Sequence, residues 1–235
     1  MATRLVVLDT ETTGLNARMG DRVVEIGCIE MIDRRVTDNR FHVYLNPERA
    51  SEEAAEHIHG LTAEFLADKP KFAEIAKDLL DYVRGAEIVI HNAAFDVEFL
   101  DQELGMAGLG KLSEHCASIT DTLTRARELH PGKRNNLDAL CERYGVDNSH
   151  RTFHGALLDA SLTAEVYLAM SRGQESLIVE SDLPQAVAGG AATFDASKLL
   201  VVAADAQELS AHEKVLAAID TESKGRTLWR ALEAP

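Results

Sequence analysis

A short apolar run near the N-terminus ends in two acidic residues. Residues 5–8 read LVVL, and Asp9 and Glu11 follow with a spacing of two. A continuous run of this length predicts a strand buried on both faces, and side chains two apart in a strand leave the same face. Two such carboxylates repel each other unless a cation lies between them, and oxygen ligands of this kind suit Mg²⁺ or Mn²⁺. A pair of solvated surface acids is the alternative, because a D-x-E occurs by chance in a chain with 39 Asp and Glu.

The order of the remaining segments predicts an α/β domain. Residues 23–32 and 41–45 are rich in β-formers, and the polar stretch 33–40 between them fits a hairpin connection. We expect further strands over 87–90 and 118–120, and helices over 71–83, 94–104, 122–129, 136–144 and 155–171. Strands first, and then strands alternating with helices, indicate a mixed sheet flanked by helices.

Two later motifs place polar side chains near the start of helices. In HNAAFD, Asp96 falls in the first turn of the helix that follows strand 87–90. A catalytic carboxylate and an acid that stabilises the helix dipole are about equally good interpretations there, and Asn92 is a candidate cap. In HGALLDA, His154 and Asp159 are five residues apart, which is roughly 140° around a helix. We therefore expect His154 on the loop before the helix if it meets Asp159; alone, it would be interpreted as a surface or capping residue.

Together these motifs suit hydrolysis of a phosphate ester. They supply four carboxylates and one side chain that titrates near neutrality, namely Asp9, Glu11, Asp96, Asp159 and His154. Divalent ions held by carboxylates form the usual clamp for in-line attack on phosphorus. No G-x-x-x-x-G-K-[ST], no G-x-S-x-G and no G-x-G-x-x-G after a strand indicates a competing chemistry.

DTETTG, HNAAFD and HGALLD, in this order, resemble the three exonuclease motifs of the DEDD superfamily, in the subclass with a histidine in the third motif. FHVYLNP, HIHGLT, DYVRGAE and PGKRNNLDALC are similar to the epsilon proofreading subunits of bacterial DNA polymerase III, over residues 4–172 and weakly beyond. The resemblance implies an RNase H-like fold with a mixed five-stranded sheet. It also implies a polymerase subunit that acts as a metal-dependent 3′→5′ exonuclease and releases deoxynucleoside 5′-monophosphates from mispaired 3′ ends of DNA.

The resemblance also assigns roles to residues. It implies two divalent cations, Mg²⁺ or Mn²⁺, held by Asp9, Glu11, Asp96 and Asp159, with His154 as the general base. It implies substrate contacts by Asp9, Glu11, Asp159, Thr10, Leu15, His59 and Asn92. A place in the core suits Leu15 and Phe95 equally well. Phe153 departs from the family, in which a smaller aliphatic residue precedes the histidine.

The implied organisation is an exonuclease domain over residues 1–172, a flexible linker over 173–195 and a polymerase-binding segment over 196–235. The linker is rich in Gly and Ala, and the last segment is too short to bury much surface alone. Gln174, Leu177 and Ile178 resemble the short peptide by which polymerase subunits hold the sliding clamp; a frayed helix end is the alternative. The sequence leaves open whether a small accessory subunit binds.

A formal net charge of −15 argues at first against a nucleic-acid partner, because phosphate contacts need Lys and Arg. Basic residues are concentrated in the segment 125–151, which contains Arg125, Arg127, Lys133, Arg134, Arg143 and Arg151. We expect this segment to contact phosphate near the site, and we expect the anionic chain to depend on a polymerase to present the DNA end. Three widely spaced cysteines, and no recognisable signal peptide or membrane span, predict a cytoplasmic location.

Two other functions stay open. An RNA-trimming relative would use the same five residues, since such a site contacts phosphate and metal. A protein that chiefly stabilises a polymerase is the second alternative, although a scaffold need not keep the complete set.

Overall fold

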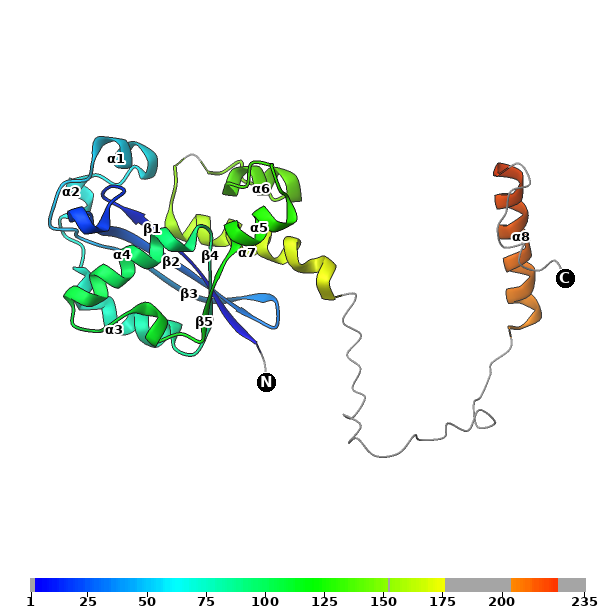
Figure 1. Ribbon diagram of the computed structural model, residues 1–235, viewed down its shortest axis with the longest axis horizontal. Helices are drawn as coiled ribbons and strands as arrows, with labels where there is room; N and C mark the ends of the chain where they lie inside the picture. Colours follow the sequence, from blue (N-terminus) through cyan, green and yellow to red (C-terminus); the bar gives the residue numbers. More distant parts are fainter. Residues whose placement is uncertain (1–2, 152, 176–203, 224–235) are drawn as a thin grey trace, which may run out of the picture. The chain divides into compact units, whose positions relative to one another are not determined.

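Five strands form one mixed sheet in the first of the two units into which the chain divides, residues 1–181 and 182–235 (Figure 1). The computed structural model describes residues 3–151, 153–175 and 204–223. The sheet has the order β3-β2-β1-β4-β5, with bounds β1 Arg4–Thr12, β2 Val23–Ile32, β3 Arg35–Tyr44, β4 Glu87–Ile90 and β5 Ser118–Asp121. Strands β1, β2 and β3 are antiparallel neighbours, whereas β4 runs parallel to β1 and β5. This mixed sheet, flanked by helices, confirms the expected fold class.

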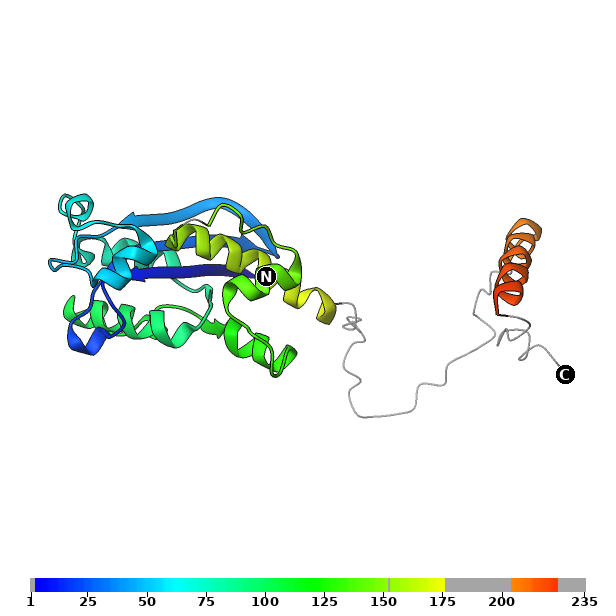
Figure 2. The ribbon, with the colours of Figure 1, turned by 90° about the horizontal axis from the view of Figure 1, so that it is seen from above.

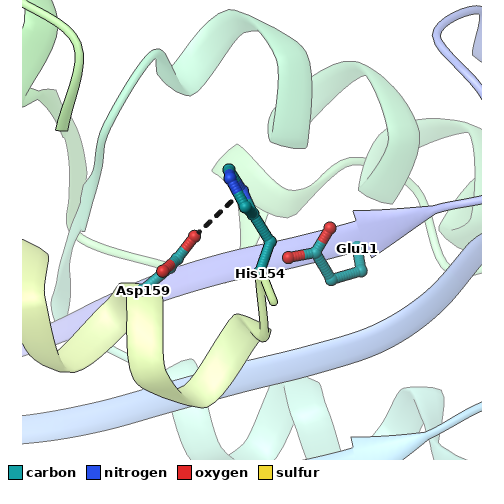
Figure 3. A group of neighbouring side chains, drawn as sticks. All are labelled: Glu11, His154 and Asp159. Atoms are coloured by element: carbon teal, nitrogen blue, oxygen red, sulfur yellow. Dashed lines mark ion pairs between the residues drawn. The ribbon is translucent and has the colours of Figure 1, made fainter. Parts of the chain in front are cut away.

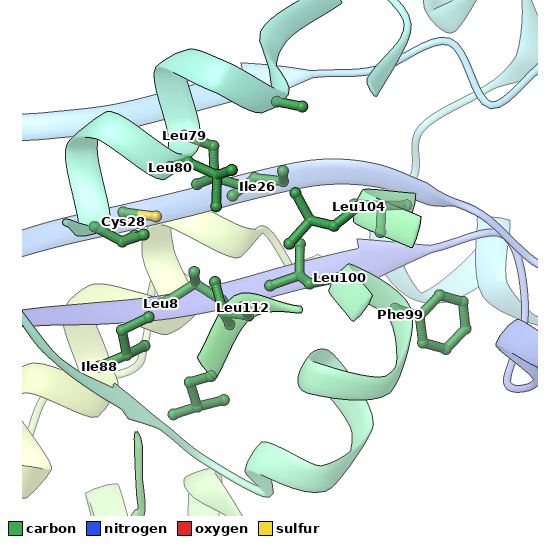
Figure 4. Packing of buried hydrophobic residues seen from close by; sticks show 14 of the residues in the cluster. Leu8, Ile26, Cys28, Leu79, Leu80, Ile88, Phe99, Leu100, Leu104 and Leu112 are labelled. Atoms are coloured by element: carbon green, nitrogen blue, oxygen red, sulfur yellow. The ribbon is translucent and has the colours of Figure 1, made fainter. Parts of the chain in front are cut away.

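Helices cover both faces of the sheet (Figure 2). On one face, α3 (Phe72–Val83) and α4 (Ala93–Met106) pack on alternate residues of β1, which include Val6 and Leu8 (Figure 4). On the other face, α7 (Ala156–Glu175) packs on the intervening residues Leu5 and Val7. Both faces of β1 are therefore buried, as its continuous apolar run predicts. The same alternation puts Asp9 and Glu11 on the α7 face of the sheet.

Helix α7 carries two apolar faces. Ala160, Ala164 and Tyr167 pack on the sheet. Leu162, Val166 and Met170 pack against α5 (Thr122–Leu129) and α6 (Leu137–Tyr144). The helix is thus held between the sheet and a second helical layer, which leaves its first turn little freedom to move.

The connection between β2 and β3 is shorter than the sequence predicts. Only Asp33 and Arg34 separate the strands, and both have positive φ, 47° and 63°. Two residues with positive φ form the tight turn that suits the twist of a hairpin. The expected connection over 33–40 was therefore wrong, because β3 is an edge strand whose exposed polar side chains hide the alternation of a strand.

The remaining helices are short or lie in the second unit. The sequence pattern gave no prediction for α1 (Glu53–His59), α2 (Ala63–Leu66) and the 3₁₀ turns Ala17–Met19 and Leu112–Glu114. In the second unit, α8 (Ala206–Glu222) begins with a capping box formed by Asp205 and Glu208. The apolar run 198–203 lies outside the described residues. Within the described ranges, no helix is both long and apolar enough to cross a membrane.

Gly27 sets the distance between the sheet and the start of α7. It lies opposite Asp9 in the β1–β2 register. A Cβ atom at this position would overlap the backbone of Ala156 and Leu157. Only glycine therefore allows the first turn of α7 to rest directly on β2, beside the acidic end of β1.

Gly27→Ala should lower the free energy of unfolding by about 1–3 kcal/mol, because the overlap is with backbone atoms that cannot rotate away. Urea unfolding of the variant and the wild type measures this difference. Gly105→Ala is the matched control, since a Cβ there meets nothing within 4 Å, and it should leave stability unchanged or raise it by up to about 1 kcal/mol. A Gly27→Ala chain as stable as the wild type would contradict this packing account.

Candidate active site

The acidic residues of the three motifs and His154 meet in one pocket of about 310 Å³, which we call the acid pocket. Asp9 and Glu11 come from the end of β1, Asp96 from the first turn of α4 and Asp159 from the first turn of α7. His154 lies on the loop before α7, as the five-residue spacing predicts. Figure 3 shows Glu11, His154 and Asp159 converging from these separate elements.

A threonine of the first motif holds the carboxylate of the second. Thr10 donates to Asp96 Oδ1 twice, from its backbone N at 3.0 Å and from its Oγ1 at 2.7 Å. Thr10 faces α4 because it alternates with Asp9 and Glu11 along β1. Thr10 was expected only to line the substrate pocket; it lines the acid pocket and also fixes Asp96, which is 3% exposed.

The third motif places a histidine beside a buried carboxylate. His154 Nδ1 lies 3.4 Å from Asp159 Oδ2, and His154 N donates to Ile58 O at 3.0 Å, which ties the loop to α1. One potential ligand atom from each of Glu11, His154 and Asp159 lies within 4.8 Å of the others. Oxygen and imidazole donors at this spacing fit a divalent cation.

Burial and mutual repulsion favour the protonated forms of the acids. Burial, followed by the nearby Asp159 and Glu25, raises the pKa of Glu11 to about 8. Burial likewise raises the pKa of Asp96 to about 7, against the hydrogen bonds from Thr10. Burial and the neighbouring carboxylates raise the pKa of Asp9 well above its ordinary value. The pocket therefore gains stability from any cation that lets these groups ionise.

Arg151 supplies one such positive charge. Its Nε donates to Asp159 Oδ1 at 2.6 Å and its Nη2 to Asp159 Oδ2 at 2.5 Å, while its Nη1 donates to Asp138 at 2.7 Å. The guanidinium Nη2 also lies 3.0 Å from His154 Nδ1. The side chain is only 8% exposed. The expectation that Arg151 belongs to a phosphate-contacting edge was therefore wrong, because the carboxylates of Asp159 and Asp138 bind its whole guanidinium fork.

A second, apolar pocket of about 250 Å³ adjoins the acid pocket. Both are lined by Thr10, Glu11, Phe95 and His154. Leu15 lies on the wall of the apolar pocket and is 82% exposed, which excludes the core alternative for this residue. His59 lines the same pocket, although it is only 4% exposed and its Nδ1 accepts from Leu61 N at 3.0 Å.

Asn92 occupies the N-cap position of α4 without capping it. Its backbone is left-handed, with φ 67°, and its side chain makes no cap hydrogen bond. Its backbone N donates instead to Asp121 Oδ1 at 3.1 Å. The side chain lines the acid pocket. In the expected clamp peptide, Gln174 lies near the end of α7, whereas Leu177 and Ile178 lie outside the described residues.

Sequence reasoning missed several residues of the site. Asp138 shares Arg151 with Asp159. Glu25 lies opposite Glu11 in the β1–β2 register, is 3% exposed and has Oε1 2.7 Å from His42 Nε2. No spacing rule connects these positions, because strand register and loop folding bring them together. A buried strand with an acid at its centre, as in VVEIGCIE, is the one signal that could have singled out Glu25.

Comparisons with known proteins identify the family. Residues 6–167 match the exonuclease family. The DNA polymerase III subunit epsilon of Escherichia coli K12 is 49% identical over 240 residues, covering 97% of this chain and 98% of that relative. The subunit epsilon of Salmonella typhimurium gives the same values. That of Rickettsia conorii is 44% identical over 223 residues, covering 92% of this chain and 96% of the relative.

Solved structures show the same fold. Exonuclease X in complex with 5′-overhanging duplex DNA matches with a TM-score of 0.57 and 26% identity, over 73% of this chain and 93% of that one. Escherichia coli exonuclease I in complex with a dT13 oligonucleotide matches with a TM-score of 0.64 and 20% identity, over 74% and 42%. With a family match over most of its length and relatives about half identical to it, this chain belongs to the DNA polymerase III epsilon subunit family and contains an exonuclease domain.

Proposed function

We propose that the chain removes mispaired 3′-terminal nucleotides from DNA as the proofreading subunit of the replicative polymerase, and releases deoxynucleoside 5′-monophosphates. The observation that carries this proposal is the meeting of four carboxylates and His154 in one pocket of a chain of this family. A mispaired terminus frays easily, so it can enter a narrow site as a single strand at a cost of a few kcal/mol. A cytoplasmic location follows from this role and stays a prediction.

The donor set suits two divalent cations, Mg²⁺ or Mn²⁺. Asp9, Glu11, Asp96 and Asp159 would hold them. When bound, such ions stabilise the negative charge that develops on the phosphate and on the departing 3′ oxygen. The chain itself holds these carboxylates on three rigid elements, β1, α4 and α7, and Thr10 orients Asp96.

The proposed general base is His154. Burial, and then the positive charge of Arg151, lower the pKa of His154, so the ring is neutral at pH 7 and able to take a proton. Its Nδ1 faces Asp159 at 3.4 Å. Arg151 Nη2, which can only donate, lies 3.0 Å from the same Nδ1, so Nδ1 carries the lone pair of the neutral ring.

The apolar pocket suits the terminal nucleoside. Leu15, Ile58 and Phe95 offer apolar surface to a base, directly beside the carboxylates. The scissile phosphate would then lie in the acid pocket. Thr10, His59 and Asn92 stay as proposed contacts to this nucleotide.

Asp9→Ala and His154→Ala should each abolish or nearly abolish release of monophosphates from a labelled 3′ end in Mn²⁺ or Mg²⁺. Loss of a general base alone lowers kcat by about 10²–10⁴-fold. Glu98→Gln is the matched control, because this acid lies on α4 two residues from Asp96 but pairs with Arg18 at the surface, where it is 46% exposed. It should keep wild-type rates.

Continued release by the Asp9→Ala, His154→Ala double variant would overturn the assignment. Matched DNA and RNA oligonucleotides distinguish the RNA-trimming alternative, since that alternative requires the faster rate on RNA.

The C-terminal segment 196–235 is proposed to bind the polymerase catalytic subunit, with 173–195 as the linker after the exonuclease domain 1–172. Helix α8 supports this, because its apolar residues Leu209, Val215 and Ile219 are 57%, 57% and 45% exposed. Adjacent exposed apolar side chains are typical of a partner-binding surface, and Val215 and Ile219 lie one turn apart on this helix. The sliding clamp, bound through Gln174, Leu177 and Ile178, and a small accessory subunit are further proposed partners.

Deletion of residues 195–235 should abolish co-purification with the polymerase catalytic subunit while nuclease activity of the free chain persists. Pull-down and a 3′-end release assay on the same preparation measure both. Retained co-purification would show that this segment is not the docking element, and lost nuclease activity would contradict the division into two functional parts.

A further inference from the structure

We propose that a basic groove beside the acid pocket binds the phosphates of the DNA strand on the 5′ side of the nucleotide to be removed. The groove has a volume of about 670 Å³ and lies between α5 and the loop before α6. It adjoins the acid pocket, because His91, Asn92 and Asn136 line both. The inference rests on the proposed nuclease function and extends it to the path of the substrate.

The charge of the groove is opposite to that of its surroundings. Arg127 and Lys133 line it, and no Asp or Glu does so within the described residues. Carboxylates line the acid pocket, the apolar pocket and two further surface pockets of the same unit. In a chain of net charge −15, a groove free of acids marks a place where a polyanion meets little repulsion.

The loop that presents Lys133 is held in place by hydrogen bonds around the buried residue Asn135. Asn135 is 7% exposed, and its Nδ2 donates to His130 O at 3.2 Å and to Lys133 O at 3.1 Å. Arg143 donates to Asn135 Oδ1 at 3.0 Å and to Arg134 O at 2.7 Å. Arg143 therefore braces the loop. The exposed side chains of Arg127 and Lys133 stay available to a ligand.

The apolar pocket and the basic groove, which both adjoin the acid pocket, suit different parts of the substrate. The apolar pocket meets the acid pocket at Glu11 and His154, and the basic groove meets it at Asn92 and Asn136. A terminal nucleoside has a base to bury, whereas the chain behind it presents one phosphate per nucleotide. The strand therefore enters through the groove, and its last base occupies the apolar pocket.

Arg134 offers a matched control. It follows Lys133 directly, carries the same charge and is exposed, but it lines neither the groove nor the acid pocket. Of the basic residues expected to contact phosphate in the segment 125–151, only Arg127 and Lys133 line the groove. Arg134→Gln removes one positive charge, as Lys133→Gln does, from the same loop without touching the groove.

The test uses three full-length chains in Mn²⁺: the wild type, the double variant Lys133→Gln, Arg127→Gln and the single variant Arg134→Gln. Each chain is assayed on two substrates. One is a single-stranded DNA oligonucleotide; the other is the p-nitrophenyl ester of thymidine 5′-monophosphate, which has no strand beyond the scissile phosphate. The ratio of kcat/KM for the oligonucleotide to kcat/KM for the ester should fall about tenfold in the double variant, or about 1.4 kcal/mol. The slope of log KM for the oligonucleotide against log salt should fall by about 1.4, since each phosphate contact on a single strand contributes about 0.7.

Arg134→Gln should keep the wild-type ratio and slope. An equal change in the ratio for Arg134→Gln would overturn the inference, because the effect would then be one of net charge. An unchanged ratio in the double variant would overturn it as well. A wild-type chain that hydrolyses neither substrate would instead refute the proposed nuclease function, so the two failures are distinguishable.

Discussion

Burial of four carboxylates in one pocket is the constraint on which the rest of the site depends. Burial raises the pKa of Glu11 to about 8 and that of Asp96 to about 7, so near neutral pH their ionised forms are costly without a nearby cation. Arg151 offsets part of this cost, because its guanidinium binds both oxygens of Asp159. A single guanidinium cannot neutralise the whole cluster, to which Asp9 also contributes. The donor set therefore fits divalent cations and explains why a nuclease can use so acidic a pocket.

The fold holds these repelling groups together by anchoring them to packed elements. The apolar part of β1 is buried on both faces, so the acids that follow are fixed in direction. Gly27 lets α7 approach the sheet closely, and the packing of α7 against α5 and α6 keeps Asp159 in place. Around this rigid centre lie an apolar pocket and a basic groove, which together match the two chemical parts of a DNA end.

Much of the fold and the central site could be predicted from the sequence, because buried strands are continuous apolar runs and the motif acids follow them directly. The position of His154 followed from a five-residue spacing that no single helix face accommodates. The role of Arg151 could not be predicted, since its partners depend on how the loop before α7 folds. The start of β3 was hidden by the polar side chains of an edge strand, and α1, which supplies Ile58 O to His154, has no clear periodicity.

The most direct test of whether the buried carboxylates form a metal site is the unfolding temperature of the full chain. It is measured as a function of pH, once with EDTA and once with saturating Mn²⁺. The pKa of the Glu11 carboxyl is raised in the folded state, from 4.5 to about 8. Such a group leaves the free energy of unfolding unchanged below pH 4.5, where it is protonated in both states. It lowers that free energy as the pH rises toward about 8. The unfolding temperature in EDTA should therefore fall over this range because of these groups, and Mn²⁺ should remove the fall by stabilising the ionised forms. The same dependence on pH with and without Mn²⁺ would contradict the account.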